Sequence, residues 1–268
     1  MTATRNIIAA AIAANRFGLG ARPGELKTVE SDPRGWLSRQ LGGKPPVLTG
    51  EGLKPSADTL KRVIDLRKEV MAERKEMRAE RKDKPANARD DDAQLKAVAL
   101  KLPIIHRPVY IDEITARITH AVNTDRPFLE RLTQFWSNHF AVSIDKVVVL
   151  GLAGAMEREA IRPRVTGTFT DMLLAVEKHP AMLLYLDNHV SIGPNSRAAG
   201  LASRRGSNRK LDINENLARE ILELHTLGVD GGYTQADVST FASEPCACWL
   251  SSSLTTRADS TRCRTYSR

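Results

Sequence analysis

Apolar residues recur at helical intervals along most of this chain. Two consecutive segments show the pattern best, and their expected inward positions are Ile111, Ile114, Ile118 and Val122 in the first, then Phe128, Leu132, Phe135 and His139 in the second. Pro103 and Pro108 are expected to interrupt the chain just before the first segment. The β-branched run at 147–150 has no second run to pair with, so we expect no sheet. The pattern predicts an all-α protein, built as an irregular multi-helix bundle.

The most informative stretch is 214–238, which begins NENLAREILELH. Its apolar positions follow helical spacing and are expected to form one inward face, made of Leu217, Ile221, Leu222 and Leu224. Gly228 then stands where a left-handed helix cap belongs. Thr234 and Asp237 have the spacing of a capping box, which begins another helix. We therefore predict a helix, a tight turn and a second helix.

Two segments differ in composition from the rest. Residues 61–102 are densely charged and have only a thin apolar stripe, which predicts one long exposed helix or a helical hairpin. Residues 189–212 are rich in Gly, Ser and Arg without a helical period, which is typical of a mobile loop. We expect residues 1–238 to form the N-terminal part of a larger helical domain that includes both segments.

The net charge of +8 is local rather than general. The excess of basic residues lies in 61–84, 189–211 and 246–268. The first two segments contain no aromatic residue on which a base would stack, so we do not expect nucleic-acid binding. The apolar run at 7–14 is far shorter than the roughly 18 residues of a membrane span, so no transmembrane segment is expected. We interpret this run as an ordinary first helix rather than a signal peptide, which favours the cytoplasm over export.

Polar residues accompany the predicted inward faces. Asn216, Glu220 and Glu223 recur on one side of the 214–225 helix, with His225 on the flank of its apolar face. His139 lies on the predicted inner face of the preceding WSNHF segment, next to Asn138. Such residues most often form a structural network of ion pairs and hydrogen bonds, which is the interpretation we favour.

The alternative interpretation is a catalytic cluster. In it, the acids and bases are His139, Glu220, Glu223 and His225, and the residues that orient substrate are Asn138, Asn195, Asn216 and Arg158. The chain lacks histidine pairs at helical spacing and has no His-Glu-x-x-His motif, so we predict no metal site. No motif identifies a cofactor.

Six segments, in order, resemble the bacterial domain-of-unknown-function 1800 family. They are NRFGLGARPGE (15–25), DPRGWL (32–37), RLTQFWSNHFAVS (131–143), HPAMLLYLDN (179–188), GPNS (193–196) and NENLAREILELHTLGVDGGYTQADV (214–238). Members of that family are large, predominantly helical proteins of undetermined activity, often encoded beside a second, exported protein. The resemblance therefore implies an exported partner protein and implies no reaction.

After Val238 the sequence departs from the family pattern. The family continues through a helix into a tryptophan-containing segment, whereas this chain becomes rich in Ser, Thr and Arg and carries its only cysteines, Cys246, Cys248 and Cys263. Our hypothesis is a change of reading frame near residue 239, so that 239–268 is a non-native or disordered tail.

Two functions follow from these observations. The favoured hypothesis is a binding or assembly scaffold that works with the exported partner. The alternative is a metal-independent, hydrolase-like enzyme that uses the His, Glu and Asn cluster.

Overall fold

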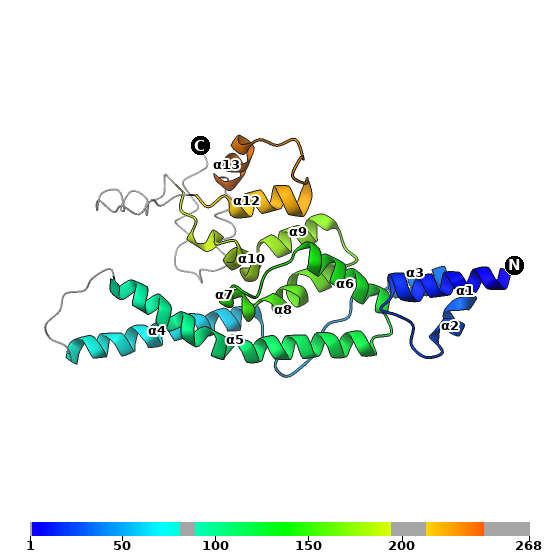
Figure 1. Cartoon of the computed structure of the whole chain (residues 1–268), viewed down its shortest axis with the longest axis horizontal. Helices are drawn as coiled ribbons and strands as arrows, with labels where there is room; N and C mark the ends of the chain where they lie inside the picture. Colours follow the sequence, from blue (N-terminus) through cyan, green and yellow to red (C-terminus); the bar gives the residue numbers. More distant parts are fainter. Residues whose placement is uncertain (1, 81–88, 194–212, 244–268) are drawn as a thin grey trace. The chain divides into compact units, whose positions relative to one another are not determined.

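A computed structural model describes residues 2–80, 89–193 and 213–243 (Figure 1). Every regular element in these ranges is helical and no strand occurs among them, as the sequence pattern predicts. None of the described helices is both long and apolar enough to cross a lipid bilayer. The chain forms two compact units. The first comprises residues 1–138 and 143–168, and the second comprises 139–142 and the chain from Phe169 onward.

The first unit begins with three short helices around a small apolar core. They are α1 (Thr2–Ile12), which continues as the π-helix η1 (Ala13–Phe17), α2 (Glu25–Ser31) and α3 (Pro33–Gln40). The core between them contains Ala10, Ala13 and Val29, covered by Trp36 and Leu37. Asp32 caps α3, because its side chain accepts a hydrogen bond of 2.9 Å from the Gly35 amide and Pro33 occupies the first helical position.

The charged segment forms two long helices, α4 (Ser56–Glu80) and α5 (Arg89–Asn123). They pair as an antiparallel hairpin through a cluster made of Val63, Leu66, Val70, Val98 and Leu102 (Figure 1). The expected interruption at Pro103 and Pro108 is wrong, because α5 continues through both prolines. A proline removes one backbone hydrogen bond and bends a helix, and burial of one face of α5 holds the bent helix together.

The predicted inward face of α5 is also wrong. Ile111, Ile118 and Val122 are 52%, 58% and 65% exposed. The buried positions on this part of the helix are instead Val109 and Glu113. They face α7 (Val147–Leu150) and α8 (Ala153–Met156), which pack against α5. Gly154 permits this close approach, because a Cβ there would lie 2.5 Å from the Cβ of Glu113.

The next helix, α6 (Pro127–His139), is likewise turned from its predicted orientation. Phe135 is 58% exposed, and the buried positions are Pro127, Leu129, Glu130 and Thr133. The spacing of apolar residues does not reveal this face, because its central residue is a carboxylate. Glu130 is inside since it has a cationic partner there.

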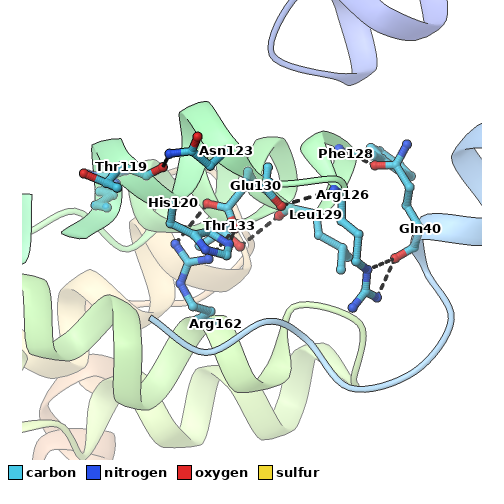
Figure 2. Close-up of polar contacts among 12 residues, drawn as sticks. Gln40, Thr119, His120, Asn123, Arg126, Phe128, Leu129, Glu130, Thr133 and Arg162 are labelled. Carbon is cyan, nitrogen blue, oxygen red and sulfur yellow. Dashed lines mark hydrogen bonds and ion pairs between the residues drawn. The ribbon is translucent and has the colours of Figure 1, made fainter. Parts of the chain in front are cut away.

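That partner is Arg162, the largest side chain with almost no exposed surface in the described part of the chain. It follows α8 through the π-helix η2 (Glu157–Ile161) and lies in the short 3-10 helix η3 (Arg162–Arg164). Its two terminal nitrogens pair with both carboxylate oxygens of Glu130, as Figure 2 shows, and one of these contacts is 3.1 Å long. Nη2 also donates to Oε1 of Glu157 at 2.8 Å. One guanidinium thus joins α6 to η2.

Further groups extend this network within the first unit. His120 of α5 places Nε2 3.0 Å from Oε1 of Glu130 (Figure 2). Glu157 accepts a 3.1 Å hydrogen bond from the Ser137 hydroxyl and pairs with Arg117 at 3.0 Å. Burial alone would lower the pKa of Arg162, but the hydrogen bonds and charges of Glu130 and Glu157 outweigh it and raise that pKa. Arg162 therefore stays protonated, and its network joins α5, α6 and η2.

A second arginine fixes the loop that follows α3. Arg126 donates to the backbone oxygen of Gln40, and the Gln40 side chain accepts from the Phe128 amide at 2.8 Å (Figure 2). Arg126 also donates to the carbonyl oxygens of Gly42 and Lys44. These bonds satisfy backbone groups that have no helical partner. The short N-terminal helices are thereby tied to the start of α6.

The second unit contains the remaining helices. They are α9 (Phe169–Glu177), α10 (Pro180–Tyr185), the 3-10 helix η4 (Asn188–Val190), α12 (Asn216–Glu220), the π-helix η5 (Ile221–Thr226) and α13 (Gln235–Ser243). Ala218, Val238 and Ala242 form a small core between α12 and α13. The predicted mobile loop at 189–212 lies outside the described residues from 194 onward, as does the tail from 244 onward, with its cysteines.

We expect Arg162→Met to lower the free energy of unfolding by about 3–5 kcal/mol, because two buried carboxylates would lose their cation. Chemical unfolding followed by circular dichroism measures the change. The matched control is Arg62→Met, which removes an exposed pair with Glu69 and should cost less than about 1 kcal/mol. Equal losses in both variants would contradict the assignment of Arg162 as the centre of the first unit.

Candidate functional site

The structure distributes the predicted site residues over both units. His139, Glu220, Glu223, His225 and Asn216 belong to the second unit, and Asn138 and Arg158 belong to the first. Asn195 lies outside the described residues. The second unit therefore contains all four predicted acid and base residues.

His225 lies in the π-helix η5 and is buried. In this turn the Leu227 amide donates to the Leu222 carbonyl, five residues earlier, at 3.0 Å. Each such bond takes one more residue into the turn than an α-helix does, which changes the side that later residues face. His225 is 5% exposed, whereas Leu224 is 58% exposed. The prediction that Leu224 faces inward is therefore wrong.

The buried imidazole meets a carboxylate at the end of α9. Nδ1 of His225 lies 2.7 Å from Oε1 of Glu177, off the line of an ideal hydrogen bond. Glu177 is only 5% exposed, and burial raises its pKa. The charges of His225 and His139 oppose the increase, and the nearby charge of Glu220 adds to it. The pair is a buried acid and base that share one interior site.

Aromatic rings close around this pair. Nε2 of His139 lies 3.1 Å from the backbone oxygen of His225, and the two imidazole centroids are 6.1 Å apart. The fully buried Phe140 packs edge-on against His225 at 5.2 Å and against His139 at 4.6 Å, and it stacks on Phe169 at 6.2 Å. This cover lowers the local polarity, which favours the neutral form of Glu177.

The other predicted acids lie nearer the surface. Glu223 accepts from Arg219 at 3.2 Å, and Arg219 also donates to Gln235 at 2.7 Å. Gln235 in turn donates to Glu215 at 2.7 Å. These bonds connect α12 and η5 to the first turn of α13. Glu223 is therefore paired with Arg219 within the fold.

The predicted capping box at the start of α13 is confirmed. The Thr234 amide donates to Oδ2 of Asp237 at 2.7 Å, and the Asp237 amide donates to the Thr234 hydroxyl at 3.3 Å. The Thr234 hydroxyl also donates to Oδ2 at 2.8 Å, and the two bonds that the carboxylate accepts, from the Thr234 amide and hydroxyl, lower the pKa of Asp237. Gly228 adopts the expected left-handed backbone, with φ of 92°. Asn216 is exposed, and its neighbour Asn214 makes the polar contacts at this end, accepting from the Asn216 amide at 3.0 Å.

In the first unit, Arg158 joins η2 to α5 and to the segment that precedes α4. It donates to Oε1 of Glu113 at 2.8 Å and to the backbone oxygen of Lys54 at 2.6 Å. The neighbouring Glu159 accepts from both the amide and the hydroxyl of Ser56, at 2.8 and 2.7 Å. Asn138 is exposed on α6. Both predicted substrate-orienting residues of this unit therefore have locations that require no substrate to explain them.

Sequence reasoning missed the buried carboxylates. Glu177 lies four residues after Leu173, on the apolar stripe that Phe169, Leu173 and Val176 define, so its position was a usable signal. Glu130 and Glu157 gave no such signal, because only the fold shows their shared cation. Among the described residues, no group of three His, Cys, Asp or Glu side chains is arranged to hold a metal ion.

Comparison with known proteins identifies a family. The family model described as Protein of unknown function (DUF1800) covers residues 12–243. No curated protein matches the chain, and no solved structure does.

We expect Glu177→Gln to change how stability depends on pH. Because the folded-state pKa of Glu177 is raised above its ordinary 4.5, the folded protein favours the neutral acid. The wild-type protein should therefore lose stability relative to Glu177→Gln as pH rises from below 4.5 through the raised pKa. Free energies of unfolding across the acidic range measure the difference.

The control for this experiment is Asp237→Asn. Hydrogen bonds lower the pKa of Asp237, so its contribution should be lost as pH falls, which is the opposite sign. The quantity compared is the free energy of unfolding of the wild type minus that of Glu177→Gln. If this difference stays constant with pH, or changes in the same direction as for Asp237→Asn, then Glu177 is not an acid stabilised in its neutral form.

Proposed function

Because the chain belongs to the DUF1800 family of proteins of unknown function, we propose that it is a helical binding or assembly scaffold that works with an exported partner protein. The observation that supports this most strongly is the mutual pairing of interior charges. Arg162 pairs with Glu130 and Glu157, and Arg158 pairs with Glu113. Groups that neutralise each other hold helices in register and are not poised for a reacting molecule.

The cluster around His225 fits the same role. An imidazole that acts as a general base has to come within hydrogen-bond distance of a substrate proton. His225 and Glu177 are each 5% exposed, and Phe140 lies against the imidazole ring. The pair therefore serves to join η5 to α9 inside the second unit.

The second candidate is a metal-independent, hydrolase-like enzyme. The contact between His225 and Glu177 favours it, because a carboxylate beside Nδ1 orients an imidazole for proton transfer. In this proposal His139, Glu220 and Glu223 assist, and Asn138, Asn195, Asn216 and Arg158 bind substrate. It ranks second because the imidazole is covered and because Glu223 is already paired with Arg219.

The two proposals differ in the expected effects of His225→Ala and Glu220→Gln. A scaffold predicts that His225→Ala lowers the free energy of unfolding by about 1–3 kcal/mol, since the buried carboxyl group of Glu177 loses its partner. Glu220→Gln should leave stability nearly unchanged. Both variants, tested below their unfolding temperatures, should still bind the exported protein encoded beside the gene, as measured by isothermal titration calorimetry.

The enzyme proposal predicts a different result. The wild-type protein would hydrolyse members of a panel of esters or amides, and both variants would lose this activity without losing stability. That outcome, together with no measurable binding of the exported protein, would replace the scaffold by the enzyme.

A further inference from the structure

A buried histidine joins the middle of α5 to the start of α7. His106 has no exposed surface, and its Nδ1 lies 3.0 Å from the backbone oxygen of Val147, the first residue of α7. A backbone oxygen can only accept a hydrogen bond, so Nδ1 carries the proton and Nε2 of the neutral ring is an acceptor. Nε2 is also buried, and it has no hydrogen-bond partner among the described residues. One nitrogen of the ring is therefore bonded, and the other is enclosed without a polar partner.

The groups that cover this imidazole are uncharged. Gly151, directly after α7, lies against the ring, because a Cβ there would stand 2.9 Å from both Cγ and Cδ2 of His106. The same Cβ would lie 3.2 Å from the methyl group of Thr59 on α4, which is itself buried. Neither α7 nor α8 contains a charged or titratable residue. The ring is therefore closed in by backbone, methyl and aliphatic groups.

Charged and titratable residues occur along the same helices, but in the described part of the chain none of them forms a hydrogen bond or an ion pair with this imidazole. Those within about two turns of the contact are Asp58, Lys61, Arg62 and Asp65 on α4, Lys101, Arg107, Tyr110, Asp112 and Glu113 on α5, and Asp145 and Lys146 before α7. The buried charge among them, Glu113, is already paired with Arg158. A proton added at Nε2 of His106 would therefore create a buried cation without a counter-ion.

Of the helices around the ring, α7 has few bonds of its own to lose. It contains four residues, far fewer than an isolated helix needs, and Lys146 at its start supplies no side-chain cap. Its position depends on packing against α5, with Val149 completely buried. The facing part of α5 is weakened as well, since Pro103 and Pro108 stand on either side of His106 and each removes a backbone hydrogen bond.

We propose that the contact between His106 and Val147 is an acid-sensitive latch, which opens and detaches α7 from α5 when the imidazole is protonated. An imidazolium donates from both nitrogens, and the fold provides an acceptor for Nδ1 alone. Detachment of α7 lets water reach Nε2. This proposal is independent of the scaffold function, because it concerns only how the first unit responds to pH.

The burial of the ring sets the direction of the pH effect. Burial lowers the pKa of His106 below its ordinary 6.5, and the hydrogen bond to Val147 opposes this decrease only in part. The closed latch is therefore fully stable above pH 6.5 and becomes weaker as pH falls from 6.5 toward the lowered pKa. Each opening takes up one proton in that range, so the equilibrium constant for opening should rise about tenfold per pH unit.

Amide hydrogen exchange of the full chain between roughly pH 7.5 and pH 5 tests the latch, with each rate divided by the intrinsic rate at that pH. The amides of Val149 and Leu152, which donate to Lys146 and Val149, should lose protection about tenfold per pH unit below 6.5. In His106→Asn their protection should not change with pH, because the asparagine amide can donate as Nδ1 does and does not titrate. The matched control is His189→Asn, which changes an exposed histidine and should behave as the wild type.

Three outcomes of this experiment would overturn the proposal. They are constant protection of α7 in the wild type, the same pH dependence in His106→Asn as in the wild type, and simultaneous loss of protection in every helix, which is global unfolding.

A titration of the wild type followed by nuclear magnetic resonance gives the same test without any variant that has to fold. The ring signals of His106 and the amide signals of α7 should follow one curve, with a midpoint below 6.5. Amide signals of α7 that do not change while His106 titrates would show that protonation leaves the latch closed, and would overturn the proposal.

Discussion

A single buried guanidinium determines how the helices of the first unit are arranged. Arg162 is 2% exposed and pairs with Glu130 of α6 and Glu157 of η2. Taking these charges out of water costs several kcal/mol for each ion, so the arrangement is stable only while every partner is present. The geometry is suited to arginine, whose planar fork of donors binds one carboxylate with two nitrogens and still reaches another.

The consequences of this constraint extend along the chain. Glu130 turns α6 so that Phe135 faces outward, and it brings in His120 from α5. Glu157 positions Ser137 and Arg117. The second unit uses the same principle with a weaker pair, in which His225 meets Glu177 under the ring of Phe140. In each unit a buried polar residue of the network lies in a π-helical turn, Glu157 in η2 and His225 in η5.

Local signals in the sequence predicted local structure well. The all-α class, the left-handed Gly228 and the Thr234–Asp237 capping box all depend on a few neighbouring residues, and each is present. Helix orientation was harder to predict. Apolar spacing placed Ile111 and Phe135 inside, yet both are outside, because the buried carboxylates Glu113 and Glu130 occupy positions that a count of apolar residues treats as polar surface. The partners that make these carboxylates tolerable are distant in sequence and are recognised only once the fold is known.

The central claim is that Glu130 and Arg162 act as one unit, and a double-mutant cycle measures this most directly. Free energies of unfolding are needed for the wild type, Glu130→Gln, Arg162→Met and the double variant. A coupling energy of roughly 2 kcal/mol or more is predicted for two buried groups in direct contact. Effects that add to within about 0.5 kcal/mol would mean that the two residues stabilise the fold separately, and would contradict the claim.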